Sequence, residues 1–267
     1  MTDGWEDALP QPASEAPSTP LGPGPPTLSR GAALAEVILC SGFPTQIFLT
    51  QILLAFGMLP FNDRGQLTIE YVTILTLADA ALLTALMLWL LARRREHPAG
   101  VFAAAPSEPR EAALGVLLIP VAGALVVAVL SALRTLVPWL HNVPHNPLEA
   151  LISTRSDAVL LGIVAIIGGG LREELQRAFI LHRFRQRLGG ATVGLVVFSA
   201  AFGAGHFVQG MDVAVTTGVL GFFWGGVYLW RRSIIAPVVC HSGFNAAEII
   251  RYAVFGSGNA GAALMIW

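Results

Sequence analysis

The sequence contains no lysine and few charged residues of any kind. Only 12% of its residues are charged and 54% are hydrophobic, whereas a soluble chain has about 25% charged residues. The mean hydropathy is +0.66. With a net charge of -1 and no basic stripe to neutralise a phosphate backbone, no nucleic-acid partner is expected. The composition predicts an all-α protein, a polytopic bundle of transmembrane helices that has the lipid bilayer as its surroundings.

Cysteine is also scarce. Cys40 and Cys240 are the only two, and both lie far apart in apolar segments. Two such residues form no disulfide framework, so we expect them to act as small packing side chains.

About seven segments are long and apolar enough to span a bilayer, which takes about 20 residues. An additional short interfacial piece would make eight. Pro44 should kink the first segment, and Glu70 and Asp79 in the second must face the bundle or a cavity. The apolar part of the fourth segment stops at Arg172, so its second half should line a protein interior. The segments are roughly 32–58, 68–92, 112–133, 157–182, 190–207, 212–230 and 233–254.

Composition also divides the chain along its length. Residues 1–30 are rich in proline and lack apolar periodicity, which predicts a disordered tail. Residues 31–110 form a front region of two spans with a proline-containing linker. Residues 111–267 form a longer and denser back region.

The arginines predict the orientation of the bundle. Those at 93–95, 183–187 and 231–232 follow the second, fourth and sixth segments, which places these three loops on one side of the membrane. By the positive-inside rule this side is cytoplasmic, and so is the N-terminus. We expect a multi-pass protein of the cell's inner (plasma) membrane.

Polar residues that could perform chemistry occur on three of these spans. Glu173 and Glu174 follow Gly168-Gly169-Gly170, and His206 ends the fifth span. His241 and Asn245 stand four residues apart, and with Glu248 they form one polar face on the last span. Isolated burial of such groups is costly, so we expect the carboxylates, imidazoles and amide to meet in one cavity.

These residues carry a family resemblance. Glu173-Glu174 with Arg177, Phe202-x-x-x-His206 and His241-x-x-x-Asn245, in that order, resemble the CAAX prenyl protease and bacteriocin-processing family of intramembrane proteases, also called the CPBP or Abi group. The similarity covers about 155 to 250. One feature departs from the family pattern, because Arg177 stands four positions after Glu173 where the family has arginine five positions after it.

The resemblance implies an intramembrane endopeptidase, with residues 111–267 as its protease domain. Glu173 matches the catalytic glutamate, with Glu174 as its neighbour, and His206 matches the histidine that helps to activate water. His241 and Asn245 match the pair that polarises the scissile carbonyl and stabilises the oxyanion. The substrate is expected to be a peptide or membrane protein, with CAAX-type processing as one form of this activity.

Three alternatives stay open at the level of the sequence. Two histidines and two glutamates could equally hold a divalent metal such as zinc, although no His-Glu-x-x-His motif occurs. The same buried groups could relay protons or ions in a transporter. A non-enzymatic scaffold or immunity protein of the same fold is the third.

The arginine pattern makes a topological prediction. Single cysteines introduced into the 93–95 loop and the 231–232 loop should react with an impermeant thiol reagent from the same side of the membrane. Labelling of the two loops from opposite sides would rule out this arrangement of spans.

Overall fold

The protein is helical wherever its structure is described. The computed structural model describes residues 28–103, 108–144 and 146–255, and within these ranges it contains helices and no β-strand. The predicted all-α fold is confirmed. Residues 1–27 of the predicted tail lie outside the described residues.

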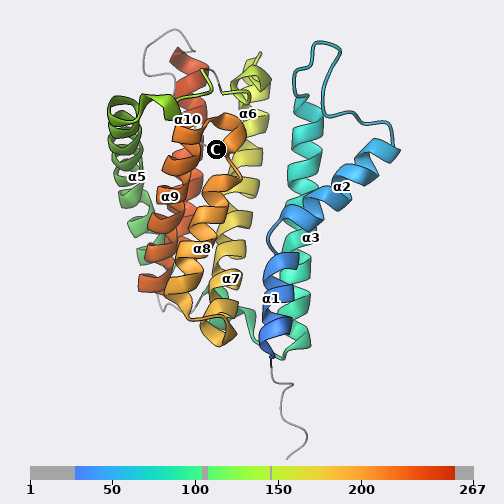
Figure 1. Cartoon of the computed structure of the whole chain (residues 1–267), viewed down its shortest axis with the longest axis vertical. Coiled ribbons are helices and arrows are strands. Elements are labelled where there is room, and N and C mark those ends of the chain that lie inside the picture. Colours follow the sequence, from blue (N-terminus) through green and yellow to red (C-terminus); the bar gives the residue numbers. More distant parts are fainter. Residues whose placement is uncertain (1–27, 104–107, 145, 256–267) are drawn as a thin grey trace, which may run out of the picture.

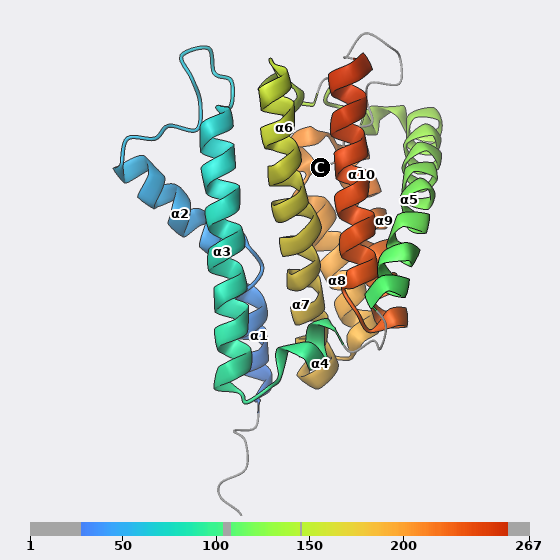
Figure 2. The ribbon, with the colours of Figure 1, turned by 180° about the vertical axis from the view of Figure 1, so that it is seen from behind.

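The helices form two groups on either side of one long rod (Figures 1 and 2). The front group holds α1 (Arg30–Leu39), α2 (Phe43–Ala55), α3 (Ile69–Arg93) and the short α4 (Pro98–Phe102). The rod consists of α6 (Arg155–Val164), a π-helical segment (Ala165–Arg172) and α7 (Glu173–Arg187). The back group holds α5 (Glu108–Leu136), α8 (Ala191–Ala204), α9 (Met211–Arg231) and α10 (Ile235–Phe255).

Several helices have the character of membrane spans. Among the described residues, α3, α5 and α9 are long and apolar enough to cross a bilayer, and α1 with α2 would make a fourth span if the bent pair counts as one. The predicted count of seven to eight spans is not confirmed. The physical reasons are that α8 is apolar but only 14 residues long, and that α7 carries many charged and polar side chains.

The predicted kink in the first segment is present. The axes of α1 and α2 differ by 42°. Gly42 precedes α2 with a φ of +89°, a conformation that favours glycine, and Pro44 lies in the first turn of α2, where no backbone N–H is needed. The bend brings the backbone around Cys40 against the rod, where Gln176 Nε2 donates a hydrogen bond to the Cys40 carbonyl at 2.8 Å.

Glycines in the π-helical segment let neighbouring helices approach the rod closely. A Cβ atom on Gly168 would collide with Thr76 of α3, and one on Gly169 or Gly170 would collide with Asn245 or Ser242 of α10. Residues without a side chain therefore serve as the contact points between helices at this segment. The rod is held between α3 on one side and α10 on the other.

Buried charges join the front group to the rod at the end where α3 and α7 finish. Arg183 is fully buried, and its guanidinium donates to Glu36 of α1 at 2.6 Å and to Glu96, after α3, at 2.8 Å. Burial by itself raises the pKa of Glu96, but hydrogen bonds with His182 and Arg183 outweigh it and lower the pKa from 4.5 to about 2. This ion-pair cluster ties α1 and the α3–α4 turn to α7.

Loss of Arg183 should destabilise the protein. An Arg183→Met variant leaves Glu36 and Glu96 without their shared cation, and removing one partner of a buried pair usually costs about 3–5 kcal/mol. We expect a clear fall in Tm for the detergent-solubilised protein. The matched control is Arg187→Met, a change at an exposed position of the same helix; equal Tm values for the two variants would contradict a stabilising role for the cluster.

Candidate active site

Four of the five predicted site residues surround one small cavity. Glu173 begins α7, His206 follows α8, and His241 and Asn245 lie on α10, and all four line a cavity of about 20 Å³. Glu174, the fifth, lies directly behind His241. Three separate segments of the chain thus bring these side chains together at the junction of the π-helical segment and α7.

Glu174 fixes the orientation of His241. Glu174 is 1% exposed, forms an ion pair with Arg177, and lies 2.9 Å from His241 Nδ1. A carboxylate paired with arginine only accepts hydrogen bonds, so His241 Nδ1 carries the proton and donates it. The other ring nitrogen, Nε2, then faces Glu173, whose Oε2 is 3.9 Å away. Trp224 stacks on the imidazole at 3.6 Å between ring centroids and holds its plane.

Arg177 keeps a structural role despite its shifted spacing. Its side chain is fully buried, and it reaches Glu174 from the position three residues later on the helix. Its guanidinium also lies over the rings of Phe198, Phe202 and Trp224 at 5.1–5.9 Å. Such contacts with aromatic faces stabilise a desolvated cation.

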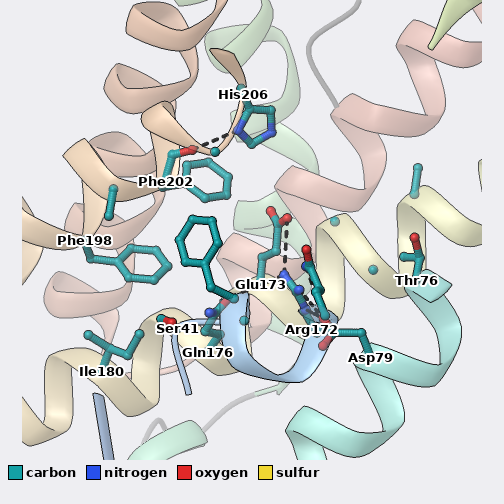
Figure 3. A pocket seen from close by; sticks show the side chains of 18 of the residues that line it. Ser41, Thr76, Asp79, Arg172, Glu173, Gln176, Ile180, Phe198, Phe202 and His206 are labelled. Carbon is teal, nitrogen blue, oxygen red and sulfur yellow. Dashed lines mark hydrogen bonds and ion pairs between the residues drawn. The ribbon is translucent and has the colours of Figure 1, made fainter. Parts of the chain in front are cut away.

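Glu173 is the more accessible of the two glutamates. Its side chain is 17% exposed and lies 3.7 Å from Arg172 Nη1, close enough for attraction but too far for a hydrogen bond. Figure 3 shows Glu173 between Arg172 and His206 at the wall of a larger pocket. Its carboxylate is therefore able to meet a molecule that enters that pocket.

His206 presents an acceptor to the site. Its Nδ1 lies 2.8 Å from the carbonyl oxygen of Phe202, and a carbonyl only accepts. In the neutral ring the proton therefore sits on Nδ1, and Nε2 keeps its lone pair. The 3₁₀ turn Phe207–Gln209 directly after it ends the α8 segment and leaves the ring at the rim of the cavity.

Asn245 has unused hydrogen-bonding capacity. One N–H of its Nδ2 donates to the Ala165 carbonyl at 3.3 Å. This carbonyl is available because Ala165 begins the π-helical segment, where the backbone hydrogen bonding of the helix changes. The amide has a second N–H, and its Oδ1 has no partner among the described residues. The amide is thus held in place while it still offers a donor.

A larger cavity adjoins this site (Figure 3). Its volume is about 430 Å³, and it lies between the front group, the rod and α8. Volumes of this order are typical of ligand pockets. Glu173, His206 and Asn245 line both cavities. The apolar part of its wall includes Phe43, Val72, Leu75, Ile180 and Phe198.

Some participants were not predicted, and one predicted polar residue lies elsewhere. Thr217 and Trp224 of α9 line the small cavity, and the Thr217 hydroxyl has no partner in the described part of the chain. A threonine and a tryptophan on an apolar helix give no signal in the sequence. Glu248 pairs with Arg251 at 3.1 Å and lines neither of these cavities.

Some of the atoms that could bind a metal are already engaged in other contacts. Glu174 is engaged by Arg177 and by Nδ1 of His241, and His206 Nδ1 by a carbonyl. Within residues 28–103, 108–144 and 146–255, no group of three His, Cys, Asp or Glu side chains is placed to hold an ion. We therefore derive no catalytic step through a metal.

Buried carboxylates and imidazoles beside a pocket, within an all-helical apolar protein, are the groups that a membrane-embedded hydrolase requires. Residues 155–247 match the model of a family described as type II CAAX prenyl endopeptidase Rce1-like. This match confirms the resemblance to the CAAX prenyl protease family, and it indicates a CAAX-type protease of the membrane. No curated protein and no solved structure matches the chain. The matched region holds the rod and all five candidate site residues, and the front group lies outside it.

The close contact between the rod and α10 yields a prediction. Gly170→Ala should lower the Tm, because the added Cβ meets Ser242 and forces α10 away from the π-helical segment; overpacking of this kind typically costs about 1–3 kcal/mol. Gly162→Ala, on the same rod with open space around it, is the control and should leave the Tm unchanged or slightly higher. A Tm for Gly170→Ala equal to that of Gly162→Ala would show that the helices are not packed this closely.

Proposed function

We propose that this protein is an intramembrane endopeptidase that hydrolyses peptide bonds with water activated by Glu173 and His206. The family match supports protease activity in a membrane setting, and the site geometry supplies the groups for the reaction. In this proposal the catalytic residues are Glu173, Glu174, His206, His241 and Asn245.

One observation carries the proposal. The small cavity has a volume of about 20 Å³, and its polar wall consists of Glu173, His206, His241, Asn245 and Thr217. A cavity needs roughly 10–15 Å³ of this kind of volume to hold one water molecule, together with two to four polar partners. The site is therefore of the right size and polarity for a single hydrolytic water next to a substrate pocket.

The first chemical step uses the two groups with free acceptor positions. Glu173 takes a proton from the water, while Nε2 of His206 accepts a hydrogen bond from its second O–H and orients it. The water oxygen forms a bond to the scissile carbonyl carbon, and the electron pair of the C=O bond moves to the carbonyl oxygen. A tetrahedral intermediate with one negative charge results.

His241 and Asn245 are placed to stabilise that charge. The second N–H of Asn245 is free to donate to the oxyanion. In this proposal His241 acts as an imidazolium, with Nδ1 donating to Glu174 and Nε2 donating to the oxyanion.

Collapse of the intermediate completes the cycle. The oxyanion electrons re-form the C=O bond, the C–N bond breaks, and Glu173 returns its proton to the departing nitrogen. The products are a carboxylic acid and an amine, and Glu173 is again a carboxylate. Glu174 takes no proton in this scheme and acts by holding His241.

The larger cavity is the proposed substrate site. It lies between the front group, the rod and α8, and its wall is mainly apolar. This environment suits a peptide or membrane-protein segment that enters from the bilayer, with CAAX-type processing as the reaction the family suggests. We place the protein in the plasma (inner) membrane, with its N-terminus in the cytoplasm on the arginine-rich side.

Turnover should depend on Glu173. In a screen of peptide release from membrane-embedded substrates, Glu173→Gln should abolish cleavage with an unchanged Tm, because the amide keeps the shape of the carboxylate but accepts no proton. Asn245→Ala should lower kcat on the order of 10²–10³-fold, the usual effect of losing an oxyanion donor.

Matched controls make this test decisive. Glu248→Gln is the same chemical change on a residue that lines neither cavity, and it should retain parental kcat. Treatment with a chelator should leave the rate unchanged. Cleavage by Glu173→Gln at near-parental rate would end the mechanism, and loss of activity on chelation would show that a metal takes part.

A further inference from the structure

Arg172 is tied to a residue outside the matched family region. Its Nε donates to Oδ2 of Asp79 at 3.0 Å, and its Nη2 also contacts that oxygen. The side chain of Asp79 is buried, with 1% exposed, and that of Arg172 is partly buried, with 11% exposed. The interaction joins the π-helical segment to the middle of α3. Arg172 directly precedes Glu173 in the chain, and the two side chains lie near each other in the pocket (Figure 3).

Asp79 is itself held from a second direction. Thr45 Oγ1 donates to Asp79 Oδ1 at 2.5 Å, and Gln46 Nε2 donates to Oδ2 at 3.4 Å. Both residues lie in the first turns of α2, just after the bend at Gly42. Residues of α2 and of the rod together therefore fix this carboxylate of α3.

This arrangement decides how Arg172 meets Glu173. The guanidinium uses Nε and Nη2 on Asp79, and Nη1 donates to Gln176 Oε1 at 3.4 Å, which leaves the nearest oxygen of Glu173 3.7 Å from Nη1. At that distance the cation attracts the carboxylate without donating a hydrogen bond to it. The lone pairs of Glu173 stay available for a proton.

We propose that Asp79 is a positioning residue for Glu173. It holds the Arg172 guanidinium beside Glu173 and prevents that guanidinium from forming a direct hydrogen-bonded pair with the glutamate. This inference rests on the proposed function, because it assigns a role to Asp79 in the same reaction. The front group, which the family match does not cover, then acts on Glu173 through this ion pair.

The physical consequence of losing Asp79 is specific. A released guanidinium next to a carboxylate forms a bidentate pair with it, which occupies the oxygen atoms that must accept the proton. The expected defect is in kcat. Asp79 also lines the larger cavity proposed for the substrate, so the KM is measured separately from kcat. A rise in KM alone would indicate a role in substrate binding and not in positioning Glu173.

The test is a double-mutant cycle with Asp79→Asn, Arg172→Gln and the double variant. We expect Asp79→Asn to lower kcat on the order of 10–10²-fold, a range typical of misplaced catalytic geometry. Adding Arg172→Gln should restore kcat toward the parental value, because the competing cation is gone. The Tm of each variant is measured in the same detergent.

A purely structural role gives a different pattern. Glu36→Gln is the control, since it weakens another buried ion pair between the front group and the rod, far along α7 from Glu173. It should lower the Tm and leave kcat unchanged. If Asp79→Asn behaves like this control, raises only the KM, or stays impaired in the double variant, the positioning role is overturned.

The two levels of the proposal fail separately. A parent protein that releases no peptide, or a Glu173→Gln variant that remains active, overturns the proposed function and this inference with it. A parent protein that depends on Glu173 but whose Asp79→Asn variant keeps full kcat overturns the inference alone.

Discussion

The pairing of buried charges is the constraint on which the rest of this structure depends. A carboxylate or guanidinium inside an apolar bundle is costly unless a partner of opposite charge lies beside it. Glu174 has Arg177, Asp79 has Arg172, and Glu36 has Arg183. Two of these pairs join helices of the front group to the rod, so the requirement for pairing also fixes how the two groups of helices dock.

The same constraint gives the two adjacent glutamates different environments. Glu174 is closed in by Arg177 and His241 and has 1% of its surface exposed. Glu173 has a more distant cation, borders both cavities and keeps its oxygen atoms free. One carboxylate is thereby suited to orient an imidazole, while its neighbour is suited to exchange a proton. This division follows from helix geometry, because consecutive residues point in directions about 100° apart.

Close backbone packing is what brings the groups within reach of each other. The glycines of the π-helical segment admit Ser242 and Asn245 of α10, and the π geometry leaves the Ala165 carbonyl for the Asn245 amide. Small residues allow membrane helices to approach in this way. The geometry of the site therefore depends on the lack of side chains at these glycines as much as on the polar residues themselves. The added methyl group of Gly170→Ala is a direct probe of that dependence.

The sequence by itself determined the helical class, the approximate bounds of most helices and the identity of the polar residues, because apolar periodicity and isolated charges are local properties of the chain. It also required Asp79 to face the interior. The count of seven to eight membrane spans stays a prediction. Only the tertiary structure decided which arginine serves which carboxylate, since Arg177 is within helical reach of either glutamate, and Asp79 and Arg172 are 93 positions apart. The π-helical segment, Thr217 and Trp224 likewise gave no sequence signal, because their roles arise from contacts between helices that no local pattern records.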